Sequence, residues 1–139
     1  MTDADVVARK LLRLNEALEE LKRPQAREAA ALVADPLLRA AVERWVQVAI
    51  ECCVDIATHV IGAEGWTPPA TSRAAFQVLA GHGRIPVDLA RRLGAAAGLR
   101  NLLVHHYTAI DLTRLAAAVR DDLDDLREFA AVSATWIHG

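Results

Sequence analysis

Residues 35–62 read DPLLRAAVERWVQVAIECCVDIATHVIG and predict one long helix. Asp35 and Pro36 form a strong pair for a helix start, an N-cap followed by a proline in the first turn. The pattern continues to about Ile61, and Gly62 is expected to end the helix. Apolar side chains cover almost all of its circumference, which is typical of a helix at the centre of a bundle.

One narrow polar stripe interrupts the apolar surface of this helix. Its members recur every three or four residues, at Arg44, Gln47, Glu51, Asp55 and Thr58 or His59. The stripe is either the solvent face of a central helix or a line of polar groups that faces a cleft or a partner subunit. The spacing leaves both interpretations open.

Helical periodicity also precedes the long helix. Thr2 or Asp3 caps a first helix that is expected to run to about Arg23, with apolar residues on one face. Pro24 breaks or kinks it, and a second piece over 26–34 follows.

Three further helices are expected after the long one. Residues 62–72, GAEGWTPPATS, form the clearest loop, and Thr71 or Ser72 caps a short helix behind it. Pro86 opens another helix, and Asp111 caps the last. No strand pair or repeat is evident, so the prediction is an all-α bundle of four long helices plus short ones, in a single domain over 1–139.

The composition limits the class of protein. Hydrophobic residues make up 53% of the chain and charged residues 24%, which excludes a disordered protein. No apolar run approaches the ~18 residues that span a bilayer, and the polar, acidic N-terminus does not resemble a signal peptide. Cys52 and Cys53 are adjacent and read as small buried residues in a reducing compartment. We therefore expect a cytoplasmic protein without membrane contact.

Charge is distributed unevenly along the chain, although the net charge is only −2. Residues 70–107 contain five arginines and one acid, whereas residues 108–139 contain six acids and three arginines. A negatively charged partner is plausible for the cationic segment. The same segment contains GAAAG at 94–98, which would let another backbone approach closely, either inside the bundle or across a dimer seam.

The cationic segment ends in GLRNLLVHHY, residues 98–107, which gathers Arg100, His105 and Tyr107. On a regular helix Arg100 and Tyr107 share a face, and Arg100 and His105 lie about 140° apart. A long arginine bridges that angle if the helix ends near His105, and residues 108–111 read as a break. The spacing alone is a weak signal, because such pairs occur by chance.

Arginine beside histidine is a minimal set of groups for cleaving RNA without a metal. The histidine exchanges protons near neutral pH, and the arginine holds the phosphate and stabilises developing charge. One histidine cannot serve as acid and base at once, so a symmetric dimer with the site at its seam is expected. No HExxH motif or Cys/His cluster with ligand spacing predicts a metal site.

RNLLVHHY resembles the Arg-x4-His-x-Tyr motif of HepT-type toxins, members of the HEPN ribonuclease superfamily, and Asn101 after the arginine is also typical of HEPN proteins. The resemblance extends over about 41–129. It implies an antiparallel, all-helical homodimer of HEPN type and an RNA endonuclease toxin that needs no metal or cofactor. It also implies a partner, an MntA-type nucleotidyltransferase antitoxin that transfers AMP from ATP to Tyr107.

The residue roles that follow are hypotheses. Arg100 holds the scissile phosphate, His105 is general acid or base, Asn101 is a supporting residue and Tyr107 is the site of AMP transfer. Glu51 and Asp55 either orient the catalytic pair or face solvent. In the alternative interpretation, the chain is a non-catalytic HEPN subunit that binds a nucleotide or phosphate beside a nucleotidyltransferase. A third interpretation is a plain structural bundle.

Overall fold

The computed structural model describes residues 3–104 and 109–137 of the chain. All of the regular structure in these ranges is helical, in agreement with the predicted class. The elements in chain order are α1 (Asp3–Glu20), the 3₁₀ turn η1 (Pro24–Arg27), α2 (Ala29–Ala34), α3 (Pro36–Glu64), α4 (Ser72–Gly81), α5 (Val87–Val104), α6 (Ala109–Ala134) and the 3₁₀ turn η2 (Thr135–Ile137).

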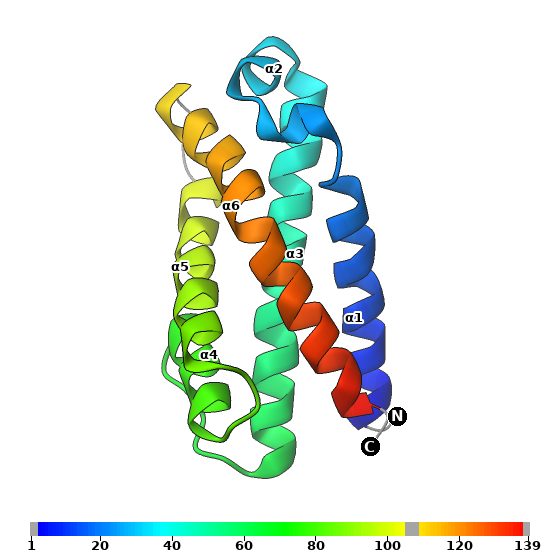
Figure 1. The fold of residues 1–139 in the computed structure, drawn as a ribbon, viewed down its shortest axis with the longest axis vertical. Helices are drawn as coiled ribbons and strands as arrows, with labels where there is room; N and C mark the ends of the chain where they lie inside the picture. Colours follow the sequence, from blue (N-terminus) through cyan, green and yellow to red (C-terminus); the bar gives the residue numbers. More distant parts are fainter. Residues whose placement is uncertain (1–2, 105–108, 138–139) are drawn as a thin grey trace.

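Four long helices, α1, α3, α5 and α6, run alternately up and down, so that each is antiparallel to the next one along the chain (Figure 1). α3 lies at the centre and contacts α1, α2, α4, α5 and α6. α6 crosses the bundle diagonally, and the short α4 packs beside α5. The antiparallel bundle of four long helices plus short ones is therefore confirmed.

The ends of α3 show why this helix forms. The Asp35 side chain accepts hydrogen bonds from the backbone N–H groups of Leu37 and Leu38, which satisfies two donors at the helix start. The helix passes through Gly62, which was expected to end it, and continues to Glu64. Gly65 adopts φ +71°, the left-handed conformation in which glycine ends helices at little steric cost.

Burial explains the apolar composition of α3. An 18-residue window of this helix has a mean hydropathy of 1.4, so by length and composition alone α3 could cross a membrane. By that measure the expectation that no segment is long and apolar enough was wrong. The same window is 56% buried within the bundle, as in the core helix of a globular protein.

The core is continuous through the bundle. Ile56 of α3, Phe76 of α4 and Phe129 of α6 are almost fully buried. The rings of Phe76 and Phe129 meet edge to face with their centroids 5.7 Å apart, a favourable geometry for aromatic pairs. Cys52 and Cys53 are buried free thiols, as predicted.

Three other predicted boundaries were displaced. The first helix ends at Glu20 instead of Arg23, and residues 26–34 divide into η1 and α2. α6 begins at Ala109, so Asp111 lies inside the helix and is not its cap. The helix break expected at 108–111 was wrong for 109–111, which are helical, and residue 108 lies outside the described residues.

Candidate active site

The Arg-x4-His-x-Tyr motif falls where α5 gives way to α6. Arg100 lies just before the last turn of α5, half-buried. His105 and Tyr107 lie outside the described residues, as does the side chain of Asn101. Arg100 is therefore the one of the four predicted site residues whose side chain the structure describes.

A cavity of about 380 Å³ opens beside Arg100. It lies between the start of α4 and the last half of α5, and it is lined by Thr71, Ser72, Arg73, Gly94, Ala97, Gly98 and Arg100. We call it the arginine cavity. Among the described residues its lining contains two arginines and no carboxylate, so it suits a negatively charged ligand.

Arg73 reaches this cavity along the small-residue face of α5. A Cβ atom placed on Gly94 would lie 2.9 Å from the Cγ atom of Arg73, closer than real contacts allow. A Cβ on Gly98 would lie 3.9 Å from Nη2 of the same arginine, an ordinary contact. The side chain therefore runs along α5 from Gly94 toward Gly98, and glycine at 94 is what leaves it room.

The small residues at 94–98 were predicted to let another backbone pack closely against this helix. In the structure, one part of the run faces the core and another part faces solvent. Ala96 is buried in the core, whereas Ala95 and Gly98 are exposed. The atoms that would lie nearest to a Cβ on Gly94 belong to the Arg73 side chain of the same chain. Internal packing accounts for part of the run.

The arginines of the cationic segment separate into two groups. Arg84 pairs with Glu64 at 2.8 Å, Arg91 with Asp88 at 2.8 Å, and Arg92 with Asp88, Asp125 and Glu128. Arg73 and Arg100 form no ion pair with any residue in the described ranges. The uncompensated charge of the segment is therefore concentrated at the arginine cavity.

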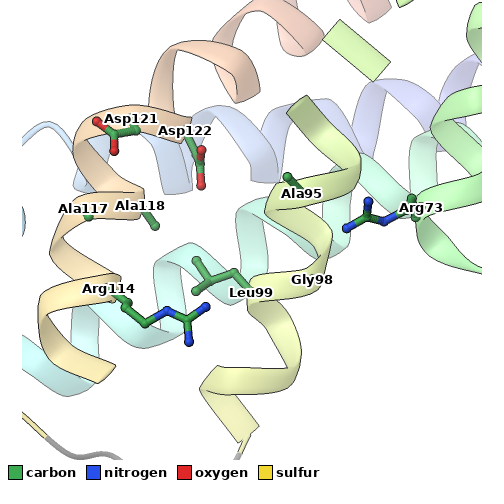
Figure 2. Close-up of a pocket in the computed structure, with 9 residues that line it drawn as sticks. All are labelled: Arg73, Ala95, Gly98, Leu99, Arg114, Ala117, Ala118, Asp121 and Asp122. Carbon is green, nitrogen blue, oxygen red and sulfur yellow. The ribbon is translucent and has the colours of Figure 1, made fainter. Parts of the chain in front are cut away.

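A second cavity of about 460 Å³ lies on the other side of Gly98, between α5 and α6. Figure 2 shows Arg73 approaching Gly98 from one side of α5 and Arg114 of α6 pointing toward Leu99 from the other, with two aspartates further along α6. These are Asp121 and Asp122. This second cavity combines both signs of charge, unlike the arginine cavity.

Burial raises the pKa of the Asp122 carboxyl to about 6, and the negative charges of Asp125 and Asp121 add to the effect. Because the folded state holds this proton more tightly than the unfolded chain, stability falls as pH rises from about 4 to about 6. Above that range the carboxylate is ionised at a cost to the fold. This residue could not be singled out from the sequence, because it lies in a run of acidic residues that is typical of a solvated face.

Asp122→Asn is therefore expected to stabilise the protein at pH 7.5. The side chain is only half-buried, so solvent screening reduces the gain to about 1 kcal/mol, or ~3–5 °C in Tm. Thermal unfolding at pH 7.5 and pH 4.5 measures it, with the exposed Asp124→Asn as control. An equal gain at both pH values would contradict the assignment, because the advantage must fade as the wild-type carboxyl becomes protonated.

Several residues of the polar stripe on α3 contact side chains of α1 or of α3 itself. Asp55 pairs with Lys10 of α1 at 3.1 Å, and His59 contacts Asp3 at 2.8 Å. Glu51 accepts a hydrogen bond from Gln47 on its own helix. The Asp55 carboxylate is thus directed to α1, which favours the partly solvated interpretation over a role in orienting Arg100.

Of all residues near Arg100, Arg73 is the one that sequence reasoning missed. It was counted in the cationic segment but not placed near the motif, because 27 positions separate it from Arg100. The available signal was the pair Gly94 and Gly98, one helical turn apart, which marks a face that a long side chain can cross.

Within the described ranges, no group of three or more His, Cys, Asp or Glu residues is arranged to hold a metal ion.

The antiparallel helices and the motif at the end of α5 define an all-helical protein of the HEPN class. The sequence profile named Ribonuclease HepT-like matches residues 14–132, most of the chain. The protein therefore belongs to the ribonuclease HepT-like family.

Two curated relatives match by sequence. The mRNA nuclease HepT of Shewanella oneidensis is 33% identical over 87 residues, which are 63% of this chain and 65% of the relative. The tRNA nuclease HepT of Aphanizomenon flos-aquae is 30% identical over 77 residues, 55% of this chain and 52% of the relative. The match thus spans about two thirds and half of their lengths.

Solved structures extend the likeness over nearly the whole chain. The tri-AMPylated HEPN toxin of Shewanella oneidensis, in complex with MNT antitoxin, superposes with a TM-score of 0.81 at 26% identity, covering 95% of this chain and 97% of that one. A toxin–antitoxin with AMP-PNP gives 0.83 at 26% identity, covering 92% and 96%. YutE of Bacillus subtilis, a cytosolic protein of unknown function, gives 0.78 at 15% identity over 96% and 89%, which shows a shared fold alone.

Proposed function

We propose that this protein is an endoribonuclease that acts as the toxin of a toxin–antitoxin pair and cleaves RNA without a metal ion or cofactor. The observation that carries the proposal is the intact Arg-x4-His-x-Tyr motif, whose arginine lines a cationic cavity in a member of the HepT-like family. The nuclease names of two relatives support RNA as the substrate.

The chemistry assigned to the motif is transesterification. The ribose 2′ oxygen attacks phosphorus, the bond from phosphorus to the 5′ oxygen breaks, and a 2′,3′-cyclic phosphate forms. His105 accepts the 2′-hydroxyl proton or donates one to the departing 5′ oxygen. Arg100 binds the non-bridging oxygens through its planar fork and stabilises the extra negative charge of the transition state.

A homodimer completes this scheme. A single His105 cannot accept one proton and donate another in the same step, whereas two copies related by symmetry supply two. The site is then shared at the seam between the copies, and the junction of α5 and α6 lies at that seam. Asn101 supports the catalytic pair from the same helix end.

Control of the enzyme is proposed to occur at Tyr107. An MntA-like nucleotidyltransferase transfers AMP from ATP to the tyrosine oxygen, forming a phosphodiester and releasing pyrophosphate. The added phosphate competes with RNA for Arg100, and the nucleoside blocks the site. A solved relative that is described as tri-AMPylated and bound to MNT antitoxin supports this mode of control.

The test compares protein produced alone with protein produced together with an MntA-type nucleotidyltransferase. Intact mass is expected to rise by one or more AMP units when the partner is present, with the first unit mapped to Tyr107, and RNA cleavage is expected to be lost. Tyr107→Phe should gain no AMP at that position and should stay toxic in the presence of the partner. An unmodified chain that neither cleaves RNA nor inhibits growth would favour the alternative, a nucleotide- or phosphate-binding partner subunit.

A further inference from the structure

We infer that Arg73 binds a phosphate of the RNA backbone next to the scissile one, and that the arginine cavity carries the strand from Arg100 toward the start of α4. The inference rests on the proposed function and deepens it, because it assigns a second phosphate site and a direction to the substrate. Three features of the described residues carry it.

The first feature is the fixed path of the Arg73 side chain. Its Cγ lies over Gly94 and its guanidinium ends near Gly98, so the side chain lies along α5 although the residue is exposed to solvent. Arg73 and Arg100 line the same cavity from two different helices. Holding an arginine in place lowers the entropy that is lost when it binds a phosphate.

The second feature is that the positive charges of Arg73 and Arg100 are not neutralised by any acidic residue in the described ranges. Arg73 and Arg100 make no ion pair inside the described ranges, although the other arginines of the segment do. Two like charges that share a cavity of about 380 Å³ repel each other until an anion binds between them. A phosphodiester supplies oxygens for both, and a cavity of this size accommodates a phosphate with its ribose.

The third feature fixes the direction of the strand. The second cavity, on the α6 side of Gly98, is lined by Asp121 and Asp122 as well as by Arg73 and Arg114, so the two aspartates offset the positive charge that would attract phosphate there. On the α4 side no carboxylate of the described ranges lines the arginine cavity, and the hydroxyls of Thr71 and Ser72 are available there as hydrogen-bond donors. Thr71 Oγ1 accepts a hydrogen bond from the Ala74 N–H at 3.0 Å, which leaves its own hydrogen free to donate. The strand is therefore directed toward α4.

The test measures binding of a short fluorescent single-stranded RNA to His105→Ala protein, which keeps the substrate intact. Adding Arg73→Gln should raise Kd about three- to tenfold and lower the salt slope by ~0.7, the value for one lost phosphate contact. Arg9→Gln, at an exposed arginine of α1, is the matched control for loss of charge and should change neither quantity by as much. In active protein, Arg73→Gln should raise KM more than it lowers kcat.

A second variant moves Arg73 without removing its charge. Gly94→Ala places a methyl group against the arginine Cγ and should weaken RNA binding in the same direction, at unchanged net charge. Gly62→Ala is its control, because a Cβ there meets nothing within 4 Å and the helix-propensity gain is similar.

The possible outcomes distinguish RNA binding by Arg73 from other roles of this residue. An Arg73→Gln variant with the affinity and salt slope of Arg9→Gln would overturn the inference while RNA cleavage by the wild type still upheld the proposed function. Weaker binding of the nucleotidyltransferase with unchanged RNA binding would reassign Arg73 to the protein partner. A change of assembly state in Arg73→Gln would reassign it to contact between copies. A wild type that neither binds nor cleaves RNA would overturn both proposals.

Discussion

His105→Ala is expected to slow RNA cleavage by ~10²–10⁴-fold, because the variant loses the group that moves a proton to or from the reacting oxygens. Binding of RNA should change far less, since Arg100 and the arginine cavity remain. The effect should therefore appear in kcat, measured as the rate of cyclic phosphate formation from a defined RNA. In living cells the same substitution should abolish growth inhibition by the chain expressed alone.

The neighbouring residue provides a matched control. His106→Ala removes the same side chain one position further along, where a regular helix would direct it away from the side of residue 105. Its rate is expected to stay near that of the wild type, with equal thermal stability in both variants. If the two variants lost activity equally, the catalytic assignment of His105 would be wrong. If neither lost activity, the motif would be a helix end without catalytic function.

The rate should also depend on pH in the way that a histidine dictates. The wild-type profile is expected to show a limb that arises from ionisation of the general acid or base. The limb should disappear from the residual activity of His105→Ala. A profile that is the same in both proteins would assign the titrating group elsewhere.

The helical class and the burial of α3 could be predicted from the sequence because each rests on periodicity over many residues, whereas the antiparallel order was expected from the resemblance to HEPN proteins. The end of α3 was misplaced by three residues because Gly62 and Gly65 are equally good signals by composition. Only Gly65 takes the left-handed conformation that ends the helix. The start of α6 was misplaced for a related reason: a good capping residue, Asp111, lies inside a helix that begins at Ala109.

The site could be predicted where it is continuous in sequence and not where it is assembled in space. Arg100, Asn101, His105 and Tyr107 fall within eight residues and form a motif that can be read directly. Arg73 lies on a different helix, and its position depends on the packing of α4 against α5. The raised pKa of Asp122 depends on burial in the same way. Periodicity does not specify such tertiary neighbours.

Arg100→Lys is expected to lower kcat by ~10²-fold, even though the charge is kept. A guanidinium presents a rigid fork of donors that matches two phosphate oxygens, whereas an ammonium is a compact point charge. Loss of one preorganised donor to developing negative charge typically costs ~10²–10³-fold in rate. Arg100 is half-buried and forms no ion pair with the described residues, so its guanidinium is available for the phosphate.

Arg91→Lys is the control for this substitution. Arg91 lies on the same helix, exposed and paired with Asp88, and lysine there should leave the rate unchanged. RNA binding by Arg100→Lys should fall by no more than about tenfold, because a lysine still neutralises one phosphate charge. A large loss of kcat with modest loss of affinity would place the arginine in the transition state. Equal losses in kcat/KM and affinity, with kcat intact, would make Arg100 a binding residue and would favour the non-catalytic alternative for this end of α5.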